Sequence, residues 1–256
     1  MNKLAQVFSK GKAFIPYLVA GDPSAEVTEK MAIEMGEAGV DLIELGIPFS
    51  DPTAEGPVIE RAHQRALASG IKTDDIFKML RSIREESNVP VALMTYANPV
   101  FTYGPERFMF NCHEVGVDAI IVPDMPFEER GDFLPFCAKY GIGWISLISP
   151  TSKERIRLIA QEAQGFIYCI SSLGVTGMRE KLSGHAVEMI KKIKEIKNIP
   201  CAIGFGISNE KQAARLAEFA DGVIIGSAIV KIIEEYGEGC PEPVMGFVRG
   251  VLAAIK

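Results

Sequence analysis

The chain has 256 residues, and its 27 Lys plus Arg against 33 Asp plus Glu give a formal net charge of −6. Hydrophobic residues make up 48% and charged residues 23%, an ordinary globular composition that argues against disorder. Because the charges form no basic stripe and no apolar stretch approaches the ~18 residues of a membrane span, we expect neither nucleic-acid binding nor membrane insertion.

Cysteine and histidine usage bears on the compartment and on metal binding. The 5 cysteines are widely spaced, with no CxxC pair, and none of the 3 histidines stands beside a cysteine or a second histidine. This pattern predicts a reducing, cytoplasmic environment and no His- or Cys-built metal site.

Short apolar runs alternate with helical patterns along the whole chain. The first helical pattern, around Val27–Ala38, stops at Gly39, and another opens with a predicted cap at Thr73. The apolar runs are Phe14–Val19, Asp41–Ile47, Val89–Tyr96, Asp118–Val122, Gly143–Ile148, Gly165–Ile170, Ile199–Phe205 and Gly222–Ile225.

Eight such runs in about 250 residues predict an α/β fold, a (β/α)8 TIM barrel. We expect one domain over residues 1–256, with an additional N-terminal helix and short extra helices. An open doubly wound sheet is the alternative, which is weakened because no GxGxxG follows the first strand.

In a TIM barrel, chemistry takes place at the C-terminal ends of the strands. Glu44 lies near that end of the second run, and the stiff loop 48–57 after it carries Asp51 and Glu55. A buried Glu in the barrel mouth has a raised pKa and suits acid–base catalysis. The structural alternatives are a barrel-layer Glu44 paired with a base, an Asx turn at Asp51 and a solvated Glu55.

Glycines follow the seventh and eighth runs, at Gly204-Phe205-Gly206 and Gly226-Ser227, each just before a helical pattern. Barrels often bind phosphate here, where backbone N–H groups and helix N-termini favour an anion, although tight packing also selects glycine. The polar loop 171–184 has the composition of a lid, with a hydroxyl at Thr176 and a close N–H at Gly177. The residues therefore predict an acid–base reaction on a small phosphorylated metabolite, without a metal.

These motifs together resemble one family, the tryptophan synthase alpha subunit. The matching segments are Phe14–Pro23, Glu44–Pro52, Gly174–Gly177, Gly204–Ile207 and Gly226–Val230, in this order over nearly the whole chain. The resemblance implies a carbon–carbon lyase that cleaves indole-3-glycerol phosphate to indole and glyceraldehyde 3-phosphate, in the last steps of tryptophan biosynthesis. It implies no cofactor in this chain.

The resemblance also implies roles for individual residues. Glu44 matches the general acid–base, and Glu55 stands where the family usually has an Asp that binds the indole N–H. Substrate contacts carry over to Tyr17, Tyr168 and Thr176, and phosphate contacts to Gly177, Phe205, Gly206, Gly226 and Ser227.

A partner follows from the same resemblance: the pyridoxal-phosphate-dependent beta subunit, in an alpha2beta2 tetramer. Pro48, Asp51, Asn98 and Asp124 are the interface candidates. Two other functions remain open at this point. One is an indole-releasing lyase that needs no partner, and the other is a non-catalytic subunit that binds the substrate and regulates a partner.

Overall fold

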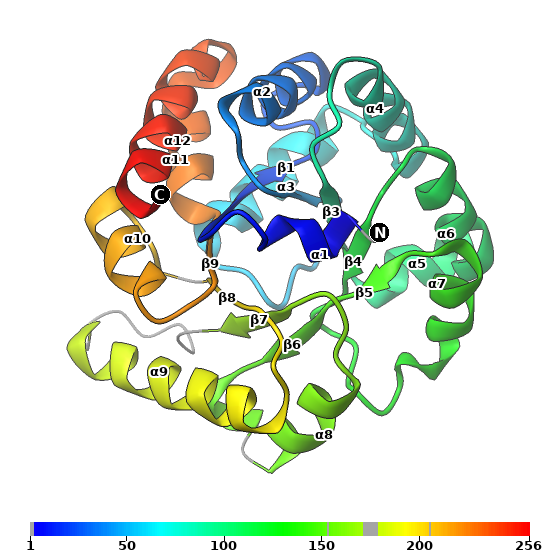
Figure 1. Ribbon diagram of the computed structural model, residues 1–256. Helices are drawn as coiled ribbons and strands as arrows, with labels where there is room; N and C mark the ends of the chain where they lie inside the picture. The colour runs from blue at the N-terminus through cyan, green and yellow to red at the C-terminus, as the bar shows by residue number, and fades with distance from the viewer. Residues whose placement is uncertain (1–2, 153, 171–178, 205) are drawn as a thin grey trace.

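The computed structural model describes residues 3–152, 154–170, 179–204 and 206–256 (Figure 1). Within them, parallel strands form one sheet in the order β5-β4-β3-β2-β1-β9-β8-β7-β6, and this sheet curves into a barrel. The strands are β1 Ala13–Val19, β2 Ile43–Gly46, β3 Val91–Met94, β4 Ala119–Ile121, β5 Gly143–Trp144, β6 Ser146–Ile148, β7 Ile167–Ile170, β8 Cys201–Gly204 and β9 Gly222–Ile225. The predicted TIM barrel is confirmed.

The strand predicted at Gly143–Ile148 is divided into β5 and β6 by Ile145. β5 pairs with β4 and β6 pairs with β7, and the Ile145 backbone N–H still donates to the Ile120 carbonyl at 3.0 Å. The two short strands therefore occupy one barrel position, so the described strands fill the eight positions that the sequence predicts.

Helices surround the barrel and follow its strands (Figure 1). They are α1 Lys3–Val7, α2 Ala25–Ala38, α3 Pro57–Ala68, α4 Thr73–Glu86, α5 Ala97–Tyr103, α6 Pro105–Glu114, α7 Leu134–Tyr140, α8 Arg155–Glu162, α9 Arg179–Ile196, α10 Glu210–Ala217, α11 Ser227–Tyr236 and α12 Pro241–Ile255, with 3-10 turns at Arg130–Asp132, Pro150–Ser152 and Gly237–Gly239. Among the described residues, none of these helices has the length and apolar character to cross a bilayer.

Two helix boundaries differ from the sequence predictions. The residue that caps α4 is Lys72 and not Thr73, because the Asp75 carboxylate accepts the Lys72 backbone N–H at 3.1 Å. The predicted loop 171–184 is shorter than expected, since α9 already begins at Arg179. Gly39 ends α2 as predicted, in the left-handed conformation with φ +87°.

Every residue of β1 is buried, because its two faces pack into different cores. Phe14 and Leu18 pack outward against the helices, whereas Ile15 and Tyr17 belong to the cluster inside the barrel. The N-terminal helix α1 lies across the middle of the ring of strands in Figure 1 and buries Leu4 in that inner cluster. The opposite end of the barrel, where the strands finish, holds the larger of the two cavities described below.

Candidate active site

A cavity of about 470 Å³ lies at the C-terminal ends of the strands. Its wall comes from the ends of β1, β2, β3, β7 and β9 and from the loops after β2 and β8. The lining residues are Tyr17, Glu44, Thr53, Ala54, Glu55, Gly56, Ile59, Met94, Tyr168, Ile170, Gly206, Ile207, Ile224, Gly226 and Ser227. Seven residues singled out from the sequence are among them, so the fold brings both predicted ends of the site into one cavity.

Glu44 lies on β2 and lines this cavity, and it is 1% exposed. Within the described residues, neither oxygen of its carboxyl group has a hydrogen-bond partner. Burial is the larger and the nearby charge of Glu55 the smaller cause that raises the pKa of Glu44 to about 8, because both disfavour a negative charge on Glu44. Glu44 is therefore mostly protonated at pH 7 and can act as an acid there.

Glu55 lies in the loop between β2 and α3, and only 3% of its side chain is exposed. Its Oε1 accepts a hydrogen bond from the Tyr17 hydroxyl at 3.3 Å. Its Oε2 lies 2.8 Å from Nε2 of His63, although this contact lacks the alignment of a hydrogen bond. The solvated Glu55 considered from the sequence is excluded, since the carboxylate is enclosed by polar partners.

The sequence analysis did not single out His63. It lies on α3 with Ala62 and Ala66 on the buried face of that helix. In the sequence this single histidine belongs to no recognisable catalytic or metal-binding motif. The only available signal was its place on the first helix after the acidic loop.

Two tyrosines that line the cavity each pack against a glycine of the neighbouring strand: Tyr17 of β1 against Gly46 of β2, and Tyr168 of β7 against Gly204 of β8. A Cβ on Gly46 would meet the Tyr17 hydroxyl at 2.3 Å, and one on Gly204 would meet the Tyr168 hydroxyl at 2.6 Å. Burial raises the pKa of both tyrosines well above the ordinary value, so their hydroxyl groups stay protonated and able to donate. Both tyrosines line the cavity that also contains Glu44.

The other end of the cavity has the features of an anion site. Gly226 precedes α11 without a side-chain cap, so the first N–H groups of this ten-residue helix are not satisfied by a capping side chain. Ser227 is exposed at the helix start, and Gly206 has the left-handed φ of +79°. Thr176, Gly177 and Phe205 lie outside the described residues.

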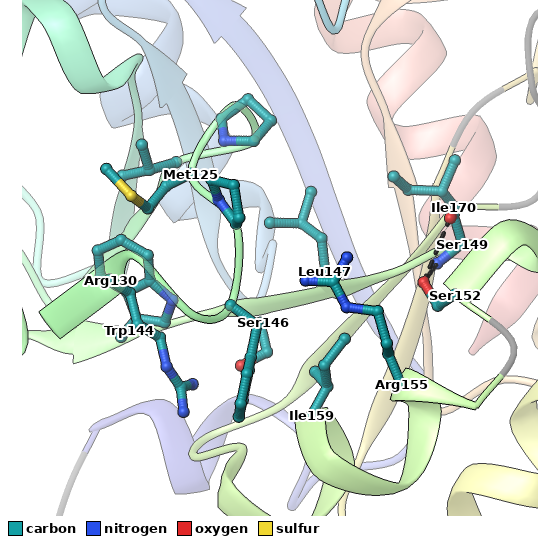
Figure 2. A pocket seen from close by; sticks show the side chains of 14 residues that line it. Met125, Arg130, Trp144, Ser146, Leu147, Ser149, Ser152, Arg155, Ile159 and Ile170 are labelled. Atoms are coloured by element: carbon teal, nitrogen blue, oxygen red, sulfur yellow. Dashed lines mark hydrogen bonds between the residues drawn. The ribbon is translucent and has the colours of Figure 1, made fainter.

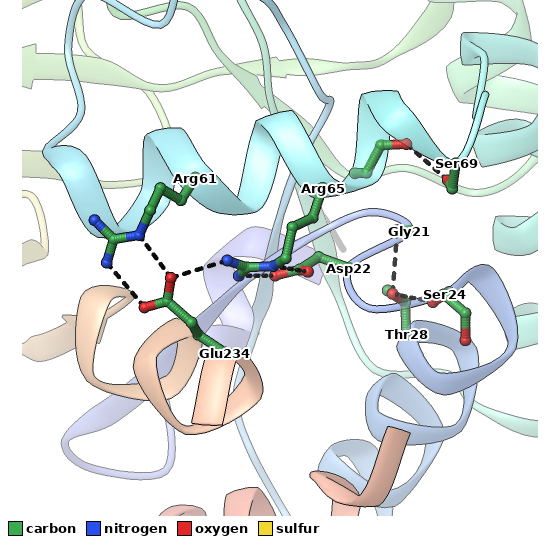
Figure 3. A network of polar contacts seen from close by, with 9 residues as sticks. Gly21, Asp22, Ser24, Thr28, Arg61, Arg65, Ser69 and Glu234 are labelled. Atoms are coloured by element: carbon green, nitrogen blue, oxygen red, sulfur yellow. Dashed lines mark hydrogen bonds and ion pairs between the residues drawn. The ribbon is translucent and has the colours of Figure 1, made fainter. Parts of the chain in front are cut away.

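A network of ion pairs fastens α3 to α11 and to the loop after β1 (Figure 3). Arg65 binds both oxygens of the buried Asp22 at 2.8 Å, and Arg61 binds Glu234 at 2.6 and 2.8 Å. Arg65 also reaches Glu234, and the hydrogen bonds from Arg61 lower the pKa of Glu234 to about 2. This network joins the helix that follows Glu55 to the helix that begins at the anion site.

Pro48, Asp51 and Asp124 lie on loops at this end of the barrel, and Asn98 lies in the first turn of α5. Asp51, Asn98 and Asp124 are exposed and Pro48 is half-buried. The Asp124 carboxylate accepts the Ala97 backbone N–H at 3.0 Å, which ties the loop after β4 to the start of α5. We call the loops after β2 and β4 and the start of α5, which carry these four residues, the rim.

A second cavity of about 200 Å³ lies between the loop after β4 and α8 (Figure 2). Arg130, Trp144, Ser146 and Arg155 line it, and none of the described residues that line it is acidic. Both arginines are already paired, Arg130 with Glu162 and Arg155 with Glu128. The larger cavity is therefore the place for acid–base chemistry.

The barrel and its buried carboxylates define the class as a TIM-barrel enzyme. A family model described as tryptophan synthase alpha chain matches residues 4–245. The chain is 44% identical over 255 residues to the tryptophan synthase alpha chain of Lacticaseibacillus casei, covering 100% of this chain and 96% of that protein. It is 47% identical over 226 residues to that of Geobacillus stearothermophilus, covering 88% and 84%.

A solved structure of the tryptophan synthase alpha chain from Legionella pneumophila has a TM-score of 0.90 and 37% identity, over 100% of this chain and 97% of that one. The chain belongs to the tryptophan synthase alpha chain family. It is a carbon–carbon lyase of tryptophan biosynthesis that acts on indole-3-glycerol phosphate.

Proposed function

We propose that the 470 Å³ cavity binds indole-3-glycerol phosphate, that Glu44 is the general acid–base and that Glu55 is the carboxylate facing the indole N–H. One observation carries this assignment: Glu44, which is neutral and has no hydrogen-bond partner in the described part of the chain, shares one desolvated cavity with Glu55, which has polar partners. Two carboxyl groups with such different surroundings are suited to different roles. The cavity also has the size usual for a small-molecule site.

The chemical difficulty is that an indole carbanion is a poor leaving group. Protonation of indole C3 by Glu44 gives an indolenine, whose C=N⁺ bond accepts the electron pair when the C–C bond breaks. The Glu44 carboxylate formed in the first step then takes the proton of the glycerol hydroxyl, which becomes the aldehyde of glyceraldehyde 3-phosphate. Glu44 thus ends the cycle protonated, as it began.

Glu55 acts through its charge in this mechanism. Among the described residues, Oε2 accepts no aligned hydrogen bond, although Nε2 of His63 lies 2.8 Å away, and this oxygen can accept the indole N–H. Its negative charge stabilises the positive charge that develops on the ring nitrogen, most strongly in a site from which water is excluded. The Tyr17 hydroxyl anchors the other oxygen, Oε1, through its hydrogen bond at 3.3 Å.

The phosphate group is proposed to bind at the start of α11. The backbone N–H groups after Gly226, the Ser227 hydroxyl and the backbone at Gly206 would contact it. The resemblance adds Gly177 and Phe205 as phosphate contacts and Thr176 as a substrate contact. Tyr17 and Tyr168 line the part of the cavity where the indole ring would lie.

The rim of loops at this end of the barrel is the proposed surface for a beta subunit, in an alpha2beta2 tetramer. Asp51, Asn98 and Asp124 offer exposed polar groups there. Pyridoxal phosphate would belong to the beta subunit, because the retro-aldol step needs only proton transfers in this chain. Five free, buried cysteines suit a reducing compartment, and we place the protein in the cytoplasm.

The test is indole release from indole-3-glycerol phosphate by the wild type, Glu44→Gln and Glu55→Gln, alone and with a beta subunit. Each variant should lose at least about 100-fold in kcat while it still binds the substrate. Glu85→Gln, an exposed carboxylate on α4, is the matched control and should keep the wild-type rate. Near-normal turnover by Glu44→Gln would refute the assignment, and substrate binding without any wild-type turnover would favour a regulatory subunit.

A further inference from the structure

His63 touches both ends of the loop that carries Glu55. It is 1% exposed on α3, within the protein interior. The backbone N–H of Phe49, at the start of the loop, donates to Nδ1 of His63 at 3.1 Å. Nε2 on the other side of the ring lies 2.8 Å from Oε2 of Glu55, at the end of the loop. A single ring therefore spans the acidic loop.

The contact with Phe49 determines which ring nitrogen carries the proton. A backbone N–H can only donate, so Nδ1 must accept and cannot itself hold a hydrogen. The neutral imidazole consequently has its proton on Nε2, the nitrogen that faces Glu55. His63 thus presents an N–H group to the carboxylate.

The ring reaches the carboxylate of Glu55 through Tyr17. With its proton on Nε2, His63 donates a hydrogen bond to the Tyr17 hydroxyl oxygen at 3.3 Å, and that hydroxyl donates to Oε1 of Glu55 at 3.3 Å. Nε2 also lies 2.8 Å from Oε2 of Glu55, without the alignment of a hydrogen bond. Tyr17 and His63 together restrict where the carboxylate points.

We infer that His63 is a positioning residue, which orients the Glu55 carboxylate toward the substrate through its Nε2–H. This inference rests on the proposed role of Glu55. The competing explanation is structural: His63 would matter only because Nδ1 accepts the Phe49 N–H and braces the loop. The two nitrogens serve these two purposes separately, so substitutions can tell them apart.

The matched pair of variants is His63→Asn and His63→Gln. The Asn side-chain oxygen lies near the place of Nδ1, so it keeps an acceptor for Phe49 but does not reach Glu55. The Gln amide nitrogen reaches the place of Nε2 and keeps a donor for Glu55. Steady-state indole release gives kcat and KM, and thermal unfolding shows whether each variant is folded.

We expect His63→Asn to lower kcat by about 10- to 100-fold with little change in KM, because a carboxylate misplaced by about 1 Å costs this much. His63→Gln should recover most of the wild-type kcat. A wild-type kcat for His63→Asn, or a His63→Gln no better than it, would overturn the inference. Failure of His63→Asn to unfold cooperatively would also overturn it, since the brace to Phe49 is retained.

A double-mutant cycle gives a readout that a structural role would not produce. If His63 acts through Glu55, His63→Asn should cause no further loss in a Glu55→Gln background. The same fold-loss in both backgrounds would overturn the inference. The wild-type protein distinguishes failure of the proposed function from failure of this inference. If the wild type releases no indole, both are refuted. If Glu55→Gln is impaired but His63→Asn is fully active, only the inference about His63 is refuted.

Discussion

Replacing Glu44 by Gln should make the protein more stable while it abolishes catalysis. Burial and the charge of Glu55 raise the pKa of Glu44 from the ordinary 4.5 to about 8. In the unfolded chain the carboxyl group loses its proton near pH 4.5, whereas in the folded protein it keeps it until about pH 8. The folded state therefore binds more protons over this range, and its stability falls as the pH rises.

The size of the effect follows from the two pKa values. Each pH unit between them costs about 1.36 kcal/mol, so raising the pH from 4.5 to 7 should cost the wild type about 3 kcal/mol. Gln has nearly the same shape and stays neutral, so it avoids this cost. For a chain of this size, about 3 kcal/mol corresponds to roughly 6–12 °C in melting temperature.

Thermal unfolding of the wild type and Glu44→Gln between pH 4.5 and 8 measures this directly. At pH 4.5 the two curves should nearly coincide, and at pH 7 the variant should melt at the higher temperature. Glu85→Gln, which removes an exposed carboxylate, should follow the wild type at every pH. A Glu44→Gln protein that is less stable at pH 7, or whose difference from the wild type does not vary with pH, would refute the reasoning.

The charge of Glu55 helps to raise the pKa of Glu44, so Glu55→Gln should lower that pKa. In the pH profile of the residual kcat/KM of this variant, the alkaline limb should therefore move from about pH 8 to a lower pH. An alkaline limb at the wild-type pH would contradict this coupling. Gly46→Ala should lower the free energy of unfolding by about 1–3 kcal/mol, because the new Cβ would meet the Tyr17 hydroxyl at 2.3 Å. The control is Gly239→Ala, whose Cβ would meet nothing within 4 Å. In denaturant unfolding it should change the free energy by less than about 0.5 kcal/mol. Arg65→Ala leaves the buried Asp22 without its arginine partner. Because Arg65 is one-third exposed, solvent weakens the pair, and we expect the free energy of urea unfolding to fall by about 2–3 kcal/mol. A decrease below about 0.5 kcal/mol would show that the pair does not stabilise the fold.

Much of the architecture was predictable because it depends on local patterns. Strands covered on both faces are apolar at every position, and eight of them alternating with helices close into a barrel. The end of the barrel that carries chemistry follows from chain direction alone. Glu44 near the end of one strand and the Gly226-Ser227 pair at the end of another could therefore be assigned to the same site.

Other features depend on distances between segments that are far apart in the chain, and only the tertiary structure decides them. The raised pKa of Glu44 requires that no base approaches it from any neighbouring strand, which no local pattern can reveal. The contact of His63 with Glu55 depends on how α3 packs against the barrel, and that of Arg65 with Asp22 on how α3 meets the loop after β1. The hydrophobic periodicity of a segment indicates which of its faces is buried. The burial and the charge at a site depend in addition on every other segment that packs around it.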